Sequence, residues 1–253
     1  MTKKLKTLTA VLAGVAALAS SAIAQEAVVM VEKEVAPVSL SVGVDIASAY
    51  VFRGVTFNDG MVAQPWMDAK TSFGLNFGVW ANFDIDDYDG TLEKNEFSEI
   101  DLYIGWGTTL ADLVDVGVGY TEYTYPMYGG EANREISVSA GLPLGPIGLG
   151  VAAYFGVGGG IEKTTYLEAT AEYGIDITEE LGASVFGSAV YLIDENGGTQ
   201  DGFQDYTVGA SIAYGILGAS VTYIGQGDDK VLPEEQYGYD VEVVGMLSIG
   251  YEF

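Results

Sequence analysis

The chain has 253 residues, with 36 Asp or Glu against 10 Lys or Arg, so its formal net charge is −26 at pH 7. This excess of negative charge makes nucleic acid and anionic lipid headgroups unfavourable partners. Cysteine and histidine are both absent, which excludes disulfides, thiolate metal sites, HExxH zinc sites and Ser-His-Asp hydrolysis. Without the commonest general base, we expect a protein that is not an enzyme and that needs no cofactor.

The N-terminal residues have the three parts of a secretory signal peptide. Three lysines lie within the first six residues, an apolar stretch runs from Leu8 to Ala19, and Ala22-Ile23-Ala24 offers a small-residue cleavage site. The apolar stretch is too short to cross a hydrocarbon core of roughly 30 Å, which argues against a membrane anchor. We therefore expect residues 1–24 to be removed on export.

The rest of the chain divides at Pro37. Residues 25–37 show no amphipathic period and are expected to form a short periplasmic lead-in. Residues 38–253 have a uniform composition, with abundant glycine, few prolines and no periodic helical face. This uniformity predicts one domain.

Segments of alternating apolar and polar residues fill this domain. A period of two is typical of a strand that has one apolar face and one wet face. Twelve such segments can be counted, over residues 38–52, 61–70, 75–83, 98–108, 114–125, 134–142, 147–155, 164–173, 181–193, 203–214, 217–226 and 240–253.

The connections between these segments alternate in length. Links after the even-numbered segments are short, whereas those after the odd-numbered segments are longer and either acidic or rich in glycine. Bacterial outer-membrane barrels have an even number of strands, with short periplasmic turns on one rim and long loops on the other. A soluble β-sandwich has no reason to sort its loops in this way. The sequence therefore predicts an all-β fold, a transmembrane antiparallel up-and-down β-barrel of twelve strands in the outer membrane.

Aromatic residues recur near the expected strand ends. Examples are Tyr50 and Phe52 at the loop rim, and Tyr173, Tyr214 and Tyr251 at the turn rim. Such residues favour a bilayer interface, where one end of the ring is apolar and the other stays wet. We therefore expect two aromatic girdles in contact with lipid; the alternative is ordinary packing between two sheets.

The last residues alternate strictly and end on an aromatic side chain. Leu247, Ile249, Tyr251 and Phe253 share the apolar face of the last expected strand. This ending resembles the signal that bacterial outer-membrane proteins present to their barrel-assembly machinery. The resemblance implies that this machinery is a partner during assembly.

The region of the first loop, residues 48–69, resembles the TorF-type porin family. That family typically reads close to Y-V-F-R-G-I-S-Q here, followed by an A-x-Q motif, and the run Tyr50–Gly54 matches it, with Ala63 and Gln64 in looser register. The run Thr56–Asn58 departs from the family's usual Ser-Gln pair. The match covers about a tenth of the chain and implies an outer-membrane barrel more firmly than it implies a substrate.

If the apolar faces meet lipid, the alternate residues face the lumen. The candidate lining residues are the carboxylates Asp45, Asp68, Glu99, Asp101, Glu135, Glu168, Glu172, Asp205 and Glu242 and the cations Arg53 and Lys70. Complete pairing is impossible because acidic residues outnumber basic ones, and unpaired buried charge is costly, so we expect water to reach many of the carboxylates. Rings of carboxylates favour cations.

The predicted function is passive diffusion of small hydrophilic solutes, preferably cationic ones, through an acidic lumen. Twelve strands lie between barrels filled by side chains and wide aqueous channels, so the alternative is a closed barrel that acts structurally or through acidic surface loops. Arg53 could narrow the pore or pair with Asp45 or Asp68. Outer-membrane lipid and lipopolysaccharide are the expected surroundings, and a homo-oligomer is left open.

The acidic loop from Asp84 to Gly90 suggests a calcium site at first sight. Its spacing does not fit an EF-hand, because the glycine at the sixth position would put Ile85 at the first. The weak metal candidates are Asp84, Asp86, Asp87 and Asp89. They could hold Ca²⁺ or Mg²⁺ against lipopolysaccharide phosphates, but a plain solvated loop is the preferred interpretation, with no metal.

Overall fold

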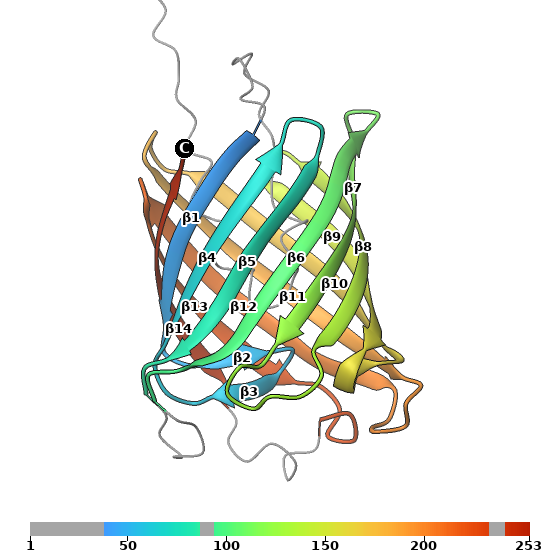
Figure 1. Ribbon diagram of the computed structural model, residues 1–253. Helices are drawn as coiled ribbons and strands as arrows, with labels where there is room; N and C mark the ends of the chain where they lie inside the picture. The colour runs from blue at the N-terminus through green and yellow to red at the C-terminus, as the bar shows by residue number, and fades with distance from the viewer. Residues whose placement is uncertain (1–37, 87–93, 233–240) are drawn as a thin grey trace, which may run out of the picture.

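Twelve antiparallel strands close into a barrel in the computed structural model, which describes residues 38–86, 94–232 and 241–253 (Figure 1). The barrel strands are β1 Val38–Ala47, β4 Val62–Thr71, β5 Leu75–Asp84, β6 Phe97–Leu110, β7 Val114–Thr124, β8 Asn133–Leu144, β9 Ile147–Gly158, β10 Thr164–Asp176, β11 Leu181–Asp194, β12 Gly202–Tyr214, β13 Leu217–Gln226 and β14 Val243–Glu252. Each barrel strand pairs with the next barrel strand along the chain, so that β1 pairs with β4. Strand β14 closes the barrel against β1, with Val44 opposite Ile249. The predicted fold class is confirmed.

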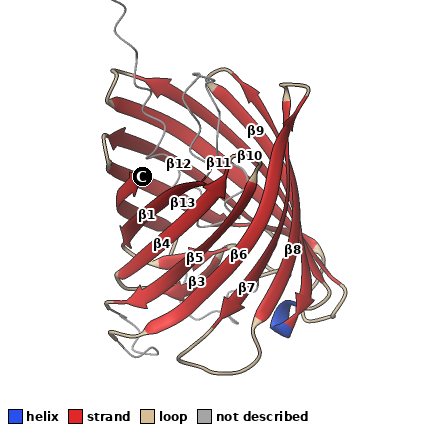
Figure 2. Cartoon of the chain, turned by 45° about the horizontal axis from the view of Figure 1, so that its top comes forward, coloured by secondary structure: helices blue, strands red, loops and turns tan. Residues whose placement is uncertain are grey.

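Three short elements complete the structure. Strands β2 Tyr50–Phe52 and β3 Val55–Asn58 form a separate hairpin, and η2 Gly159–Ile161 is a 3₁₀ turn between β9 and β10 (Figure 2). The described part of the chain contains no helix with the length and apolarity of a transmembrane span. The expected signal peptide and lead-in, residues 1–37, lie outside the described residues.

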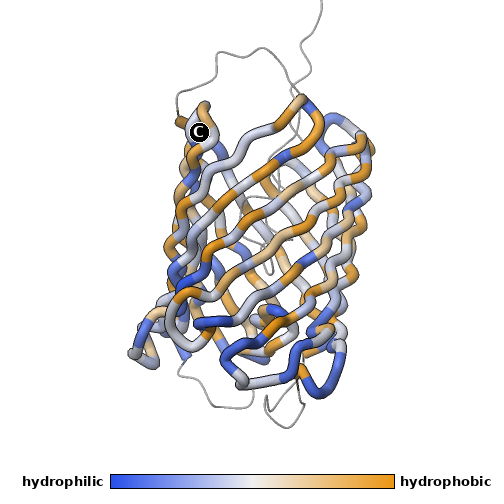
Figure 3. The backbone as a smooth tube through the Cα atoms, turned by 90° about the vertical axis from the view of Figure 1, so that its right-hand side faces the viewer, coloured by the Kyte–Doolittle hydropathy of each residue, from blue (hydrophilic) through white to orange (hydrophobic). Residues whose placement is uncertain are grey.

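The two faces of the barrel differ in polarity, as the alternation requires. On β6, Leu102 and Ile104 are exposed on the outside while Glu99 and Asp101 are buried inside. The outer face is therefore apolar along the strands, and hydrophilic residues gather at one end of the barrel (Figure 3). On β14, Leu247, Ile249 and Tyr251, with Phe253 just beyond the strand, are exposed on the outer face.

The connections sort by length between the two ends of the barrel. Short turns such as Gly145-Pro146 and Gly215-Ile216 join strands at the end where the C-terminus lies (Figure 1). Gly145 and Gly215 have φ of 69° and 60°, a left-handed conformation that glycine adopts without steric cost. The longer connections and the β2-β3 hairpin lie at the other end, here called the loop end.

The first expected strand, residues 38–52, is too long. β1 ends at Ala47, and the chain then turns inward into the β2-β3 hairpin at the loop end (Figure 1). Tyr50 is only 4% exposed, and Phe52 packs against the same buried apolar cluster, so neither is part of a lipid-facing girdle. The alternation of β1 is interrupted at Ala47-Ser48-Ala49. Ala47 and Ala49 are buried inside, and polar partners on distant strands hold the hairpin within the barrel.

Inward-facing aromatic rings lie over glycines on neighbouring strands. Trp66 faces Gly43, Tyr103 faces Gly78 and Phe186 faces Gly209. A Cβ at Gly78 would lie 2.5 Å from Tyr103 Cζ and 2.6 Å from the carbonyl oxygen of Met67. The backbone contact means that moving the Tyr103 ring alone would not make room for a side chain.

Substitution Gly78→Val should therefore destabilise the barrel by about 1–3 kcal/mol, the usual cost of overpacking. Thermal unfolding of the refolded protein in detergent measures this change. Gly148→Val is the matched control, because a Cβ at Gly148 meets no atom within 4 Å. Equal melting temperatures for the two variants would contradict the packing of Tyr103 on Gly78.

Candidate functional site at the loop end of the barrel

The turn of the β2-β3 hairpin consists of Arg53 and Gly54. Their φ values are 48° and 75°, and Phe52 pairs directly with Val55, which fits the two-residue turn with two left-handed residues that matches the twist of a hairpin. A left-handed conformation is uncommon for a residue such as Arg53. A Cβ on Gly54 would lie 2.8 Å from Asp205 Cβ, so the turn rests directly on β12.

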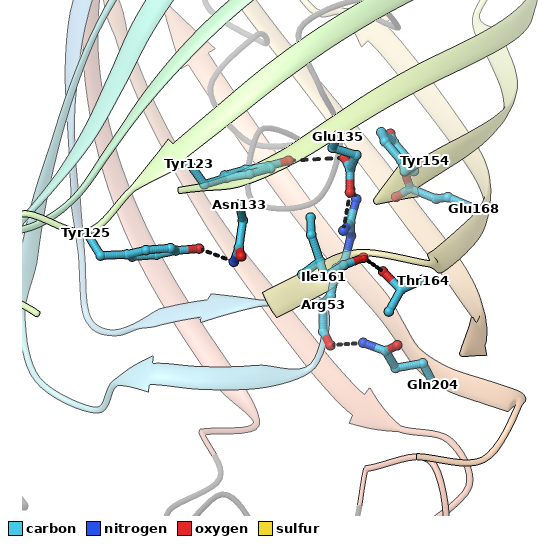
Figure 4. A network of polar contacts seen from close by, with 10 residues as sticks. All are labelled: Arg53, Tyr123, Tyr125, Asn133, Glu135, Tyr154, Ile161, Thr164, Glu168 and Gln204. Carbon is cyan, nitrogen blue, oxygen red and sulfur yellow. Dashed lines mark hydrogen bonds and ion pairs between the residues drawn. The ribbon is translucent and has the colours of Figure 1, made fainter. Parts of the chain in front are cut away.

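The side chain of Arg53 crosses to β8 and binds Glu135 (Figure 4). Its Nη1 and Nη2 donate to the two carboxylate oxygens at 2.8 and 3.1 Å, the two-pronged arrangement that gives strong guanidinium–carboxylate pairs. Arg53 is 7% exposed and Glu135 only 2%. Burial alone would lower the pKa of Arg53, but the charge of Glu135 raises this pKa above its usual value, so the guanidinium stays charged.

Three aromatic rings surround the same guanidinium group. Its Cζ lies 3.8 Å from the ring centroid of Tyr166 and 4.8 Å from those of Phe52 and Tyr154. A guanidinium within about 6 Å of an aromatic face is attracted by the negative face of the ring. We call Glu135, Phe52, Tyr154 and Tyr166 the Arg53 cage.

A β-bulge on β12 brings two polar side chains to the hairpin. Val190 pairs with Asp205 and Tyr191 with Phe203, which leaves Gln204 as the extra residue. A bulge of this kind redirects side chains that strict alternation would send outward. Gln204 and Asp205 are accordingly both buried, and Gln204 Nε2 donates to the backbone carbonyl of Arg53 at 2.7 Å.

The base of the hairpin is held by further walls of the barrel. The Tyr50 hydroxyl donates to Glu99 Oε2 on β6 at 2.8 Å, and Asn58 Nδ2 donates to Asp84 Oδ1 on β5 at 2.6 Å. The hairpin also packs in the apolar cluster of Ala47, Ala49, Tyr50, Val51, Val62, Ile224, Val244 and Met246. The first loop is thus fixed across the lumen at the loop end.

The carboxylates expected in the lumen fall into three groups. Asp45, Glu99, Asp101, Glu135, Glu168 and Asp205 are buried in the half of the barrel nearer the loop end. Toward the turn end, Asp68 accepts a hydrogen bond from Tyr103, Glu172 is half-buried and Lys70 is exposed. Glu242 lies just before β14 and is exposed.

The partner of Arg53 differs from the two that were expected. Arg53 binds Glu135 rather than Asp45 or Asp68, because the hairpin carries its turn away from β1 and β4 to β8 and β12. Tyr154, Tyr166 and Gln204 were not among the residues predicted from the sequence. Tyr154 shares its inward side of β9 with Gly148, Gly150 and Ala152, and an aromatic residue on the polar side of a strand is the signal that could have found it.

The buried charges near the hairpin are unbalanced. Among the described residues Arg53 is the only buried basic side chain. Asp101 Oδ1, Glu168 Oε1 and Asp205 Oδ2 are buried and have no hydrogen-bond partner in the described part of the chain. The site therefore holds several buried carboxyl groups and a single buried guanidinium among the described residues.

The described part of the acidic loop does not form the metal site that its sequence suggested at first sight. Asp84 is fully buried and accepts hydrogen bonds from Asn58 and Asn82, while Asp86 pairs with Lys94. Asp87 and Asp89 lie outside the described residues. Over residues 38–86, 94–232 and 241–253, no group of three acidic side chains is placed to hold a metal ion.

A bacterial protein family of unknown function, Gcw_chp, matches residues 32–246. The chain belongs to the Gcw_chp family. A comparison with curated proteins finds no match. Two solved porin structures have a similar fold. The KdgM porin in complex with disordered oligogalacturonate has a TM-score of 0.50 at 7% identity, over 85% of this chain and 98% of that one. The NanC porin has a TM-score of 0.51 at 9% identity, over 83% of this chain and 97% of that one.

In this Gcw_chp protein, Glu135→Ala should leave the guanidinium of Arg53 buried without its partner. Removing one member of a buried ion pair costs about 3–5 kcal/mol, and denaturant unfolding of the refolded barrel measures the loss. Glu131→Ala is the control, because Glu131 pairs with Arg134 at 3.1 Å on the exposed rim, where an ion pair contributes at most about 1 kcal/mol. Equal losses for the two variants would show that Glu135 does not hold Arg53.

Proposed function

We propose that this chain is an outer-membrane channel through which small hydrophilic solutes diffuse, cations in preference to anions. The observation that carries the proposal is the excess of buried carboxylates over Arg53 inside the barrel. A carboxylate buried without a partner is costly, so a cation that enters the barrel would find partners there. Rings of carboxylates favour cations.

The first loop would set the width of this channel. The hairpin reaches from β1 to β8 and β12. We assign the constriction of the channel to its turn residue Arg53, whose side chain is buried inside the barrel. A fixed positive charge among carboxylates keeps the local field from holding cations too tightly, since conduction requires that a bound ion can also leave.

Fold and sequence support an outer-membrane location. The outer face is apolar and ends in exposed aromatic side chains such as Tyr214, Tyr251 and Phe253, as in barrels that contact lipid. The signal-like residues 1–24 and the ending on Phe253 fit export and insertion by the assembly machinery. The similarity of Tyr50–Gly54 to TorF-type porins supports the same assignment.

The ligand of one porin of similar fold differs in charge from the solutes that we propose for this chain. One of them is in complex with oligogalacturonate, whose sugar units carry carboxylates. An interior with surplus carboxylates repels such a solute. We therefore propose neutral or cationic solutes for this chain.

A closed barrel is the second candidate, and the hairpin is the observation that favours it. If the hairpin and the side chains around it fill the lumen, no ion passes and the exposed loops become the functional surface. The two candidates differ in a single measurement.

Planar-bilayer recording of the refolded protein, residues 25–253, under a salt gradient distinguishes them. We expect stable current steps with a reversal potential on the cation side, and a larger conductance for Arg53→Ala because a side chain and a positive charge leave the constriction. The double substitution Glu99→Gln, Asp101→Asn should reduce the cation preference. Glu131→Gln, on the exposed rim, should change neither quantity. Folded protein that carries no current, in the native sequence and in Arg53→Ala, would contradict the channel.

A further inference from the structure

The Arg53 cage has the form of a receptor for a guanidinium group. The carboxylate of Glu135 accepts two parallel N–H bonds, at 2.8 and 3.1 Å, and the ring of Tyr166 lies 3.8 Å from the guanidinium carbon. A fork of two N–H donors and a flat face suited to stacking are properties of guanidinium that an ammonium group lacks. The cage therefore recognises shape as well as charge.

Three of the four cage residues belong to the barrel wall, whereas Phe52 and the occupant, Arg53, belong to the first loop. Glu135, Tyr154 and Tyr166 come from β8, β9 and β10, and these strands pair with one another in sequence. Hydrogen bonds from Tyr123 to Glu135 and from Tyr154 to Glu168, at 3.1 and 3.0 Å, fix two of the walls. The cage would thus keep its form if the side chain of Arg53 moved away.

A second pair of carboxylates lies close enough to receive that side chain. Glu168 and Asp205 both interact electrostatically with Arg53. They are 4% and 1% exposed, and each has one buried oxygen without a hydrogen-bond partner among the described residues. These two oxygens are an independent observation that the region can accept hydrogen bonds from a second cation.

Movement of Arg53 need not disturb the hairpin. The backbone is held independently of the guanidinium, by Gln204 on the Arg53 carbonyl and by Asn58 on Asp84. Rotation about the side-chain bonds of Arg53 would exchange one carboxylate partner for another, so its guanidinium would not be left buried without a partner.

We propose that the Arg53 cage is a binding site for small solutes that carry a guanidinium group, which exchange with the side chain of Arg53 as they pass. This assignment rests on the proposed channel and names the class of cation that it selects. In the structure the protein fills the site with its own guanidinium. An incoming one takes its place on Glu135 while Arg53 turns to Glu168 and Asp205.

Binding can be measured apart from conduction. Arg53→Ala empties the cage, and ethylguanidinium supplies the missing group in solution. We expect ethylguanidinium, at roughly 100-fold its dissociation constant, to raise the melting temperature of refolded Arg53→Ala by about 5–10 °C. The double variant Arg53→Ala, Glu135→Gln should show no such rise, and the variant Arg53→Ala, Glu131→Gln should show all of it.

Ethylammonium at the same concentration tests the class of ligand. An equal rise with ethylammonium would overturn the assignment to guanidinium, as would no rise with either cation. If Arg53→Ala does not refold, Arg53→Lys is used instead, because an ammonium leaves the two-pronged acceptor of Glu135 incompletely filled. The same outcomes then apply.

Bilayer recording separates this proposal from the one on which it rests. Current without a rise in melting temperature overturns the guanidinium site and leaves the channel. A rise that requires Glu135, in a barrel that carries no current, overturns the channel and supports the cage as a binding site alone. Both effects together, with ethylguanidinium reducing the potassium current of Arg53→Ala, are the result expected.

Discussion

A buried ion pair between Arg53 in the first loop and Glu135 on β8 connects parts of the chain that lie 82 residues apart. Withdrawing two charges from water is costly, and such a pair is favourable only when its geometry is good and its remaining polar atoms are satisfied. Here the pair is two-pronged, Tyr123 donates to Glu135, and three rings cover the guanidinium. Losing either partner would leave an uncompensated charge, so the pair adds to the other contacts that hold the hairpin inside the barrel.

The closed barrel makes this arrangement possible. All strand edges of a closed sheet are paired, so its wall is a continuous frame on which side chains from distant segments keep fixed positions. Strands β5, β6, β8 and β12 each contribute a polar partner to the hairpin. The outer face is apolar and the polar residues turn inward, and the interior carboxylates that result give the hairpin its anchors.

The alternation of single residues was sufficient to predict the wall of the barrel. Strand count, the sorting of turns and loops, and the inward direction of Glu99, Asp101 and Glu168 all depend on neighbours in the chain, which a period of two records. The first loop could not be predicted in this way. Tyr50 and Phe52 have the same parity as the apolar residues of β1, yet they lie inside, where Tyr50 binds Glu99 and the neighbouring Arg53 binds Glu135 and Gln204.

The β-bulge on β12 also could not be predicted from the alternation of residues. Strict alternation would place Gln204 and Asp205 on opposite faces, and only the register between β11 and β12 reveals that both are buried. The run from Tyr50 to Gly54 includes the arginine and glycine that form the hairpin turn. Its motif gave no indication of which wall the arginine reaches.

A disulfide between Gly54→Cys and Asp205→Cys tests most directly whether the first loop lies inside the barrel. A Cβ at position 54 would lie 2.8 Å from Asp205 Cβ, and a disulfide needs about 3.8 Å, so a shift of about 1 Å suffices. The native chain contains no cysteine, so no other thiol competes. In outer membranes this pair should oxidise almost completely, whereas Gly54→Cys with Glu172→Cys, nearer the turn end of β10, should stay reduced. A Gly54–Asp205 cysteine pair that stays reduced in folded barrel would show that the hairpin lies outside the lumen.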